Sequence, residues 1–307
     1  MPRIRSLALL VLGSLLLAGC VRLTPRAVVH REVPASEFVS VAGQAVHVER
    51  RGAGAPILLL HGFGESTFAW RAVVPALARD HATVAIDLNG FGWTDRPADP
   101  GAYTLAGQAE LVLGVADALG IERFSVIGHS YGGGIALYLA ARFPDRVRAL
   151  VLVDNTQPLW SAARRSSLFR ARWLSRVFAR TLALTRGRVR SGLRSAFYDD
   201  GKVTRALVDE YLERLRVQGA GDAFYGLSRP GGEAPFELDL ATVRQPALVV
   251  WGERDTVIDP AVGRARAAKM PAARFVALPA CGHAPLEECP QSLLAALLPF
   301  LAERAAD

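Results

Sequence analysis

The residues Gly128-His129-Ser130-Tyr131-Gly132 decide the fold of this chain. A short apolar run, 124–127, precedes them, and a small-residue stretch with helical periodicity, 135–142, follows them. A serine in this setting lies on a tight strand-to-helix turn that exposes its hydroxyl group. Glycine is needed on both sides, because a side chain there would collide with the neighbouring strand and helix. The stretch therefore predicts a nucleophilic serine, Ser130, between a buried strand and a helix.

The sequence on both sides of this turn has the pattern of an α/β protein. From about residue 37, short apolar runs alternate with stretches of helical periodicity, which is typical of a mostly parallel sheet covered by helices. An antiparallel pair is predicted within 38–50, followed by buried strands at 56–60, 83–86, 124–127, 150–153, 247–251 and 275–278. Helices are predicted at 68–79, 105–119, 135–142, 260–269 and 291–304.

One region breaks this alternation. It has no clear strand, and ten arginines but no acidic residue lie between Asp154 and Asp199. We interpret 157–235 as a helical cap inserted into the core, which divides the core into 37–156 and 236–307. A cap helix is predicted at 169–180, with an apolar face over the site and a solvated basic face. The alternative is that its basic face contacts anionic lipid headgroups.

A second glycine-rich motif, His61-Gly62-Phe63-Gly64, follows the strand predicted at 56–60. A serine attacking a carbonyl group forms a tetrahedral intermediate with a negative charge on oxygen, which fixed backbone amides stabilise. We predict that the amides of Phe63 and Tyr131 are these donors. The two motifs together predict an oxyanion hole beside the nucleophile.

A serine hydroxyl is a poor nucleophile without a base. Of the six histidines, His283 follows the last predicted strand and is the one in the expected chain order. The base needs a carboxylate on its far side, and we predict Asp255, just past a buried strand. Asp154 also follows a strand and remains the alternative. We interpret Glu253 as a solvated loop charge and Asp259 as the N-cap of the following helix.

The order of these motifs resembles the α/β-hydrolase superfamily across residues 37–305. The matching pieces are HGFG (61–64), DLNGFG (87–92), GHSYG (128–132), GERD (252–255) and GH (282–283). The resemblance implies an eight-stranded, mostly parallel sheet flanked by helices, with a cap over the site. It also implies an acyl-enzyme mechanism in which Ser130 attacks, His283 moves the proton and water releases the acid. Ser130 argues against the superfamily's epoxide hydrolases and haloalkane dehalogenases, which carry aspartate there.

The first twenty residues form a separate segment. An uncharged stretch of sixteen residues separates Arg5 from Arg22; a membrane-spanning helix needs about 20, so 1–19 is predicted to be a cleaved signal peptide. Its end, Leu17-Ala18-Gly19-Cys20, resembles the lipobox of bacterial lipoproteins. This resemblance implies lipidation of Cys20 and a lipid-anchored protein of the bacterial cell envelope, with the outer membrane favoured. An ordinary secretory signal is the alternative. Residues 20–36 are interpreted as a tether.

The two remaining cysteines, Cys281 and Cys289, bracket His283. An oxidising compartment permits a disulfide bond between them, but the sequence gives no distance between the two thiols. We therefore favour the interpretation that both are buried free thiols.

Composition narrows the function further. Hydrophobic residues make up 51% of the chain, which excludes a disordered protein. The formal net charge of +7 comes almost entirely from arginine, and no nucleic-acid recognition motif accompanies it, so no nucleic-acid partner is predicted. No cofactor or metal is predicted. The expected function is hydrolysis of small carboxylic esters with an apolar acyl group. The alternatives are a hydrolase of carbon–carbon bonds in dicarbonyl compounds and a non-catalytic scaffold that binds lipid or protein.

Overall fold

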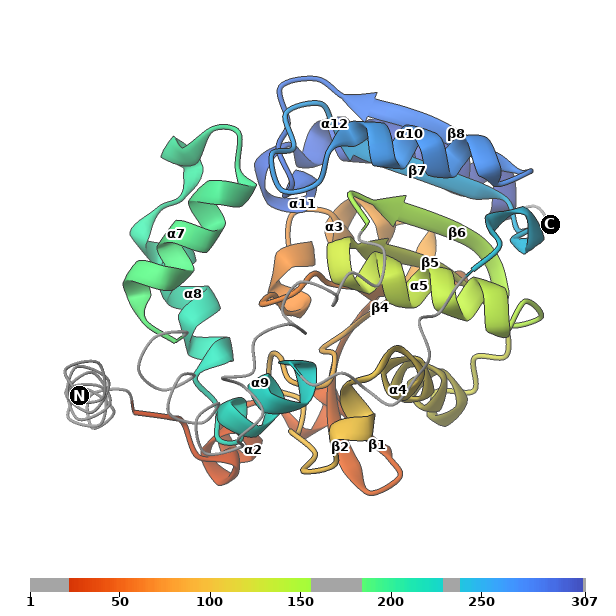
Figure 1. Cartoon of the computed structure of the whole chain (residues 1–307). Helices are drawn as coiled ribbons and strands as arrows, with labels where there is room; N and C mark the ends of the chain where they lie inside the picture. Colours follow the sequence, from red (N-terminus) through yellow and green to blue (C-terminus); the bar gives the residue numbers. More distant parts are fainter. Residues whose placement is uncertain (1–21, 156–183, 229–237, 306–307) are drawn as a thin grey trace, which may run out of the picture.

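The computed structural model describes residues 22–155, 184–228 and 238–305. Its centre is an eight-stranded sheet with the strand order β1-β2-β4-β3-β5-β6-β7-β8 (Figure 1). Strand β2 pairs antiparallel with β1 and β4, and all other neighbours are parallel. The strands are β1 (Phe38–Val41), β2 (Gln44–Arg51), β3 (Ala55–Leu60), β4 (His81–Ile86), β5 (Phe124–His129), β6 (Val147–Val153), β7 (Ala247–Gly252) and β8 (Ala273–Leu278). The predicted eight-stranded, mostly parallel sheet is confirmed.

Helices cover both faces of the sheet, so the core has two layers (Figure 1). One face carries α4 (Leu105–Ala118), α5 (Ser130–Arg142) and α10 (Pro260–Lys269), and the other carries α3 (Val74–Leu77) and α12 (Pro290–Ala305). Successive residues of β3 alternate between the layers: Leu58 and Leu60 join one cluster, Ile57 and Leu59 the other. Central strands buried on both faces read as continuous apolar runs, which is why the sequence showed them so clearly.

The helix predicted at 68–79 is wrong in its extent. The structure has a 3₁₀ turn at Thr67–Trp70 and then the short helix α3. Pro75 lies in the first turn of α3, where its missing N–H is tolerated. Inside a longer helix the same ring would clash with the preceding turn, so the helix begins there instead of running through it.

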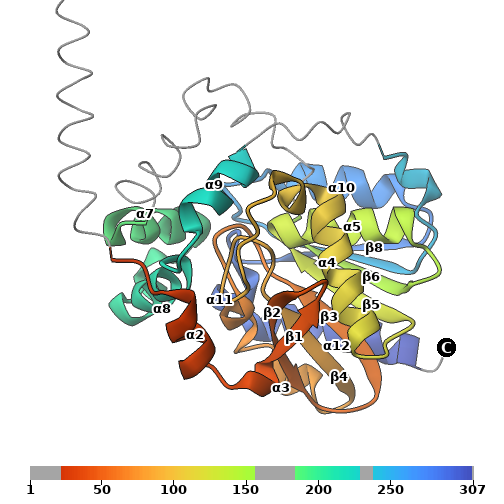
Figure 2. The same cartoon turned by 90° about the horizontal axis from the view of Figure 1, so that it is seen from below.

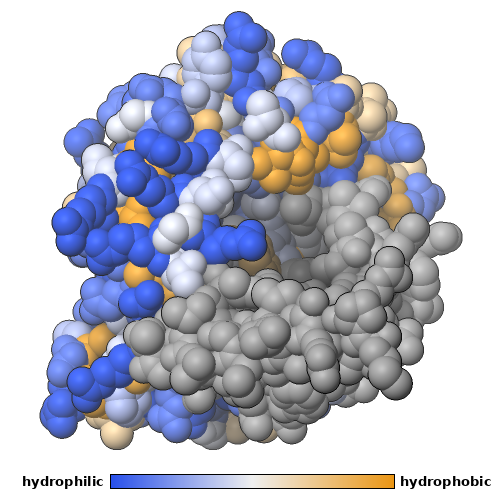
Figure 3. Space-filling model, turned by 60° about the vertical axis from the view of Figure 1, so that its left-hand side comes forward, coloured by the Kyte–Doolittle hydropathy of each residue, from blue (hydrophilic) through white to orange (hydrophobic). Residues whose placement is uncertain are grey.

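The region predicted to be a cap is helical in its described part. It contains α7 (Arg186–Ala196), α8 (Arg205–Leu215) and α9 (Ala220–Ser228), which lie to one side of the sheet (Figure 1). Its small core includes Phe197, Val208 and Leu212 and also Ala284, beside His283. Figure 3 shows that most of the described surface on this side is hydrophilic. The predicted helix at 169–180, with its proposed lipid contact, lies outside the described residues.

The segment predicted to be a tether is partly folded. Residues Arg26–Glu32 form helix α2, which lies beside the cap in Figure 2. Thr24 forms a bridge with Val217, and Arg26 forms an ion pair with Asp95 at 2.8 Å. A free spacer over 20–36 is therefore corrected to a segment that is docked from residue 24 onward. Residues 1–21, with the predicted signal and Cys20, lie outside the described residues. No helix in the described ranges is long and apolar enough to cross a membrane.

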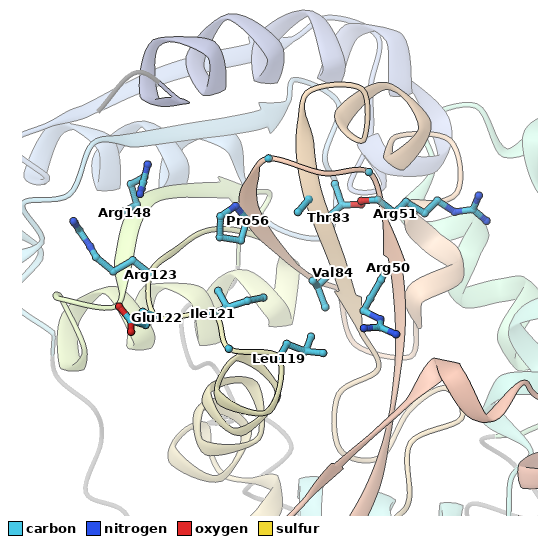
Figure 4. A pocket seen from close by; sticks show the side chains of 14 residues that line it. Arg50, Arg51, Pro56, Thr83, Val84, Leu119, Ile121, Glu122, Arg123 and Arg148 are labelled. Carbon is cyan, nitrogen blue, oxygen red and sulfur yellow. The ribbon is translucent and has the colours of Figure 1, made fainter.

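A surface pocket of about 760 Å³ lies at the amino ends of the central strands. Figure 4 shows its mixed lining: Pro56 and Ile121 lie between the arginines 123 and 148 on one side and the arginines 50 and 51 on the other. In open parallel sheets, ligands bind beyond the carboxyl ends of the strands. All the residues singled out in the sequence as catalytic follow those carboxyl ends, so the candidate site lies at the opposite edge from this pocket.

Candidate active site

Ser130 occupies a strained turn between β5 and α5. Its φ is +46°, in the left-handed region that non-glycine residues rarely adopt. The neighbouring glycines make this turn possible: a Cβ on Gly128 would collide with the backbone of Gly132, and a Cβ on Gly132 would collide with the last carbonyl of β3. The Gly132 amide also donates to the carbonyl of His61 at 3.1 Å. The nucleophile turn and the His61–Gly64 loop are thus packed directly together.

The structure brings Ser130, His283 and Asp255 together in a hydrogen-bonded line. Ser130 Oγ lies 2.9 Å from His283 Nε2, and His283 Nδ1 lies 2.8 Å from Asp255 Oδ2. The other carboxylate oxygen of Asp255 accepts from the amides of Val257 and Ile258 at 2.7 and 2.9 Å. Each of the three side chains belongs to a residue that is at most 7% exposed. They come from the carboxyl ends of β5, β7 and β8.

The two candidate acids have different surroundings. Burial alone would raise the pKa of Asp255, but its hydrogen bond with His283 and the charge of His283 lower that pKa below its usual value. Asp154 is fully buried, and its Oδ1 accepts from the Gly252 amide at 2.9 Å. Burial, with the neighbouring Asp255, raises the pKa of Asp154 well above its usual value. The carboxylate placed to pair with a cationic His283 is therefore Asp255.

The two other nearby carboxylates have the roles expected from the sequence. Glu253 is exposed. Asp259 caps α10, because its Oδ1 accepts from the amide of Ala261 at 2.8 Å. Neither is hydrogen-bonded to His283, whose two ring nitrogens contact Asp255 and Ser130.

The loop predicted to form the oxyanion hole lies beside the nucleophile turn. The rings of Phe63 and Tyr131 are 6.5 Å apart, edge to face. The amide of Gly62, in contrast, donates to Glu65 Oε2 at 2.7 Å, so it is already used within the protein. The amide of Gly62 is therefore not the donor predicted for the oxyanion, and the prediction for Phe63 stands as the sequence made it.

Sequence reasoning missed one largely buried ion pair at the site. Glu65 Oε2 lies 3.0 Å from His129 Nδ1, and the ring of His129 is 5.3 Å from that of His283. Burial alone would lower the pKa of His129, but the charge and hydrogen bond of Glu65 raise it to about 9. Burial alone would raise the pKa of Glu65, but His129 and the Gly62 amide lower it to about 2. The one signal in the sequence was a charged residue, Glu65, inside a glycine-rich loop.

The interpretation that Cys281 and Cys289 are free thiols is wrong. They form a disulfide bond, with their Cα atoms 6.1 Å apart. The short helix α11 (Pro285–Glu288) turns the chain back between them, and this turn brings two residues eight positions apart within the range for a disulfide. His283 is therefore enclosed in a small covalent loop.

The cap also holds the His283 loop. The backbone N–H of His283 donates to the carbonyl of Ala196, at the end of α7, at 2.7 Å. The carboxylate of Glu288 accepts from the amides of both Asp199 and Gly282, at 2.6 and 2.7 Å. The position of the base therefore depends on the cap as well as on the sheet.

Within the described residues, one group of side chains has the types and spacing that a metal ion needs. It consists of Asp154, Asp255 and His283, whose ligand atoms lie within 4.8 Å of one another. Both ring nitrogens of His283 already contact Ser130 and Asp255. These hydrogen bonds explain the clustering without a metal.

This arrangement can perform nucleophilic catalysis. A serine hydroxyl bonded to an imidazole, which in turn is bonded to a carboxylate, can lose its proton as it attacks an electrophilic carbon. Comparison with known proteins agrees: the family model for the alpha/beta hydrolase fold matches residues 55–290. The chain belongs to this family. Its sheet order and its helical insertion after β6 are those of an α/β hydrolase.

This α/β hydrolase is similar to proteins with several activities. A 2-hydroxymuconate semialdehyde hydrolase from Pseudomonas putida is 30% identical over 261 residues, which cover 80% of this chain and 86% of that protein. The dihydrolipoyllysine-residue acetyltransferase component of an acetoin cleaving system, also from P. putida, is 30% identical over 273 residues. The match covers 87% of this chain and 70% of that protein. The enol-lactonase structure from Burkholderia xenovorans LB400 has a TM-score of 0.71 at 25% identity, with 86% and 99% covered.

Proposed function

We propose that the protein hydrolyses small carboxylic esters through an acyl-enzyme intermediate. In this proposal Ser130 is the nucleophile, His283 the general base and acid, and Asp255 the carboxylate that orients His283. The observation that carries the proposal is the 2.9 Å contact between Ser130 Oγ and His283 Nε2, a distance at which a proton can be transferred. The similarity to an enol-lactonase, named for a cyclic ester substrate, supports the choice of an ester.

Each step follows from the geometry of these side chains. Ser130 Oγ attacks the ester carbonyl while His283 Nε2 takes its proton, and the amides of Phe63 and Tyr131 stabilise the oxyanion. His283 then protonates the departing alkoxide, which leaves the acyl group on Ser130. Water attacks this acyl-enzyme by the same route and releases the acid. Asp255 stabilises the imidazolium each time it forms.

An apolar acyl group suits the surroundings of Ser130. Phe91 packs edge to face against Phe63 at 5.2 Å and against Tyr131 at 6.2 Å. Phe63 is 49% exposed, although it is a large hydrophobic residue. Covering such a side chain with an acyl chain would remove apolar surface from water, which favours binding.

A second candidate function is hydrolysis of a carbon–carbon bond in a dicarbonyl compound. The similarity to a 2-hydroxymuconate semialdehyde hydrolase over 86% of that protein favours it as strongly as the lactonase favours an ester. The same triad serves both reactions, but here the leaving group is a carbon atom that must be protonated. The substrate would therefore have to be one in which the carbon atom of the leaving fragment can accept a proton.

One experiment separates these candidates. The kcat/KM values for p-nitrophenyl esters of increasing chain length are compared with that for a dienoate-type dicarbonyl compound, and Ser130 is labelled with a fluorophosphonate. We expect labelling and the higher kcat/KM for an ester. A higher kcat/KM for the dienoate would favour the carbon–carbon hydrolase. A protein that neither reacts with the fluorophosphonate nor turns over any substrate would be a non-catalytic scaffold.

We also propose that the protein is exported and lipid-anchored through Cys20 in the bacterial cell envelope, facing the periplasm or the cell surface. The lipobox-like sequence 17–20 supports this proposal, and the Cys281–Cys289 disulfide fits an oxidising compartment. Replacing Cys20 by Ala should abolish the mass increase from lipid and release the protein without detergent. Equal membrane partition and equal mass for both forms would contradict the anchor.

A further inference from the structure

Glu65 and His129 form a pair that contacts three parts of the site, and their side chains are 12% and 2% exposed. Glu65 Oε2 accepts from His129 Nδ1 at 3.0 Å and from the Gly62 amide at 2.7 Å. His129 Nε2 lies 2.7 Å from the carbonyl oxygen of His283. The pair thus connects the oxyanion loop, the turn before the nucleophile and the loop that carries the base.

The partners of His129 require it to be a cation. A carboxylate and a backbone carbonyl can only accept hydrogen bonds. Nδ1 faces the carboxylate of Glu65 and Nε2 faces the carbonyl of His283, so both contacts are hydrogen bonds only when both ring nitrogens carry a proton. The pKa of about 9 for His129 agrees with this geometry.

We propose that Glu65 and His129 are positioning residues of the reaction, which together hold the His61–Gly62 peptide and the backbone of His283 in register with Ser130. This inference rests on the proposed acyl-enzyme function. Neither side chain needs to touch the substrate, since each acts through a backbone group. Glu65 holds the backbone amide of Gly62, and His129 holds the backbone carbonyl of His283.

The negative charge of Glu65 maintains the hydrogen bond from His129 Nε2 to the carbonyl oxygen of His283. Without that charge, the buried His129 would lose one proton, and one of its two hydrogen bonds would be lost with it. The rings of His129 and His283 are only 5.3 Å apart, so the carboxylate also offsets a fixed positive charge beside the base. The other titratable groups that act on this pair are His61, Asp154, Tyr211 and Glu287.

The test is Glu65→Gln, which keeps the size and a hydrogen-bond acceptor but removes the charge. We expect kcat per active site to fall about 10- to 100-fold, because misplacement of reacting groups by about 1 Å costs this much, with KM nearly unchanged. The ratio of wild-type to variant kcat should be largest near pH 7 and approach one above pH 9, where wild-type His129 also loses its proton. A purely structural role would change the melting temperature but not this ratio.

The matched control is Glu37→Gln. Glu37 also contacts a histidine, His47, at 3.3 Å, but this pair is not hydrogen-bonded to the triad; its kcat and pH profile should stay those of the wild type. Active sites are counted by fluorophosphonate labelling, so that misfolded molecules are left out when kcat is calculated. If Glu65→Gln does not fold, the positioning role is tested with His129→Asn instead, which should show the same loss in kcat.

The outcomes separate this inference from the proposed function. A wild-type protein that the fluorophosphonate does not label would overturn the acyl-enzyme proposal itself. A labelled wild type together with a folded Glu65→Gln variant of normal kcat, or with a kcat ratio that stays constant with pH, would overturn only the positioning role.

Discussion

Two of the buried histidines at the site, His129 and His283, have rings 5.3 Å apart and differ in the group that faces Nε2. Nδ1 of His283 faces Asp255 and Nδ1 of His129 faces Glu65, so each imidazole has its own carboxylate. Nε2 of His283 faces the hydroxyl of Ser130, whereas Nε2 of His129 faces a carbonyl oxygen. A hydroxyl can donate or accept, but a carbonyl can only accept.

This difference decides what each imidazole can do. His283 can stay neutral, accept the hydroxyl hydrogen and take the proton during attack. His129 must keep a proton on Nε2, so it cannot serve as a base without breaking its own contact. An imidazole–carboxylate pair is therefore not by itself a sign of catalysis; the group at the far nitrogen distinguishes a base from a fixed cation.

The largest expected effect comes from removing the hydroxyl that distinguishes the two histidines. Ser130→Ala should lower kcat by about 10⁴-fold or more, because the nucleophile is lost, while the fold is kept. Steady-state kinetics on an activated ester measure this loss. Ser125→Ala, on the strand β5 that precedes Ser130, is the control and should keep normal kcat. A Ser130→Ala protein with a tenth of wild-type turnover would show that another group is the nucleophile.

The next largest effect comes from the carboxylate of His283. Asp255→Asn should lower kcat by about 10³- to 10⁴-fold, because the amide removes the charge that stabilises the imidazolium and can favour the wrong tautomer. Asp154→Asn should cost much less, since its carboxyl group contacts the Gly252 amide. Both variants are measured on one ester. A large loss at Asp154 with near-normal kcat at Asp255 would reverse the assignment.

The His129 pair predicts a pH dependence of stability. Its pKa rises from 6.5 to about 9 on folding, so its contribution is fully present below pH 6.5 and lost as pH rises through 9. The pKa of Glu65 falls from 4.5 to about 2, so its contribution is present above pH 4.5 and lost as pH falls through 2. The free energy of unfolding of the wild type should therefore exceed that of Glu65→Gln by the largest amount between pH 4.5 and 6.5.

The size of this difference is on the order of 3 kcal/mol in the free energy of unfolding, from the shift in the pKa of His129. Urea unfolding of both proteins at pH 6 and pH 9.5 measures it. A difference that is equal at the two pH values would mean that His129 is not charged in the folded protein.

The smallest expected effect comes from the disulfide bond, which constrains the loop of His283 but not the strand that ends in His129. His283 lies inside the loop closed by Cys281 and Cys289, whereas His129 ends a central strand. Replacing both cysteines by serine should lower the free energy of unfolding by about 2–3 kcal/mol, the entropy expected for a loop of this length. Activity should fall while the alkaline pKa of His129 stays the same. Urea unfolding and a pH profile test this, and a fall in that pKa would contradict it.

The sequence predicted best those features that depend on residues close together in the chain, namely the central strands and the catalytic residues that follow them. The central strands were found because they are buried on both faces. Ser130, Asp255 and His283 were found because each lies beyond the carboxyl end of a strand, and the carboxyl ends of parallel strands meet at one edge of the sheet. The same reasoning preferred Asp255 but kept Asp154, which follows the neighbouring strand, as the alternative. That choice depends on which carboxylate reaches Nδ1, a distance that sequence does not carry.

The features that the sequence missed depend on contacts across the fold. The disulfide requires the turn at α11, and the Glu65–His129 pair requires a loop after β3 to lie under the end of β5. Hydrophobic periodicity reports burial, but not which buried polar groups meet. Helix α2 was missed because its short, mixed sequence is stabilised by partners almost two hundred residues away, at Arg216 and Gln218.

That docked segment has a practical consequence for producing the protein. Cutting the gene at residue 37, where the sequence places the start of the domain, would delete α2 together with its buried residue Val29. It would also leave the Arg216 carbonyl without the Thr24 amide that caps it at 2.7 Å. A soluble recombinant form should begin before Thr24, and an affinity tag belongs at the other terminus, where α12 ends at the surface.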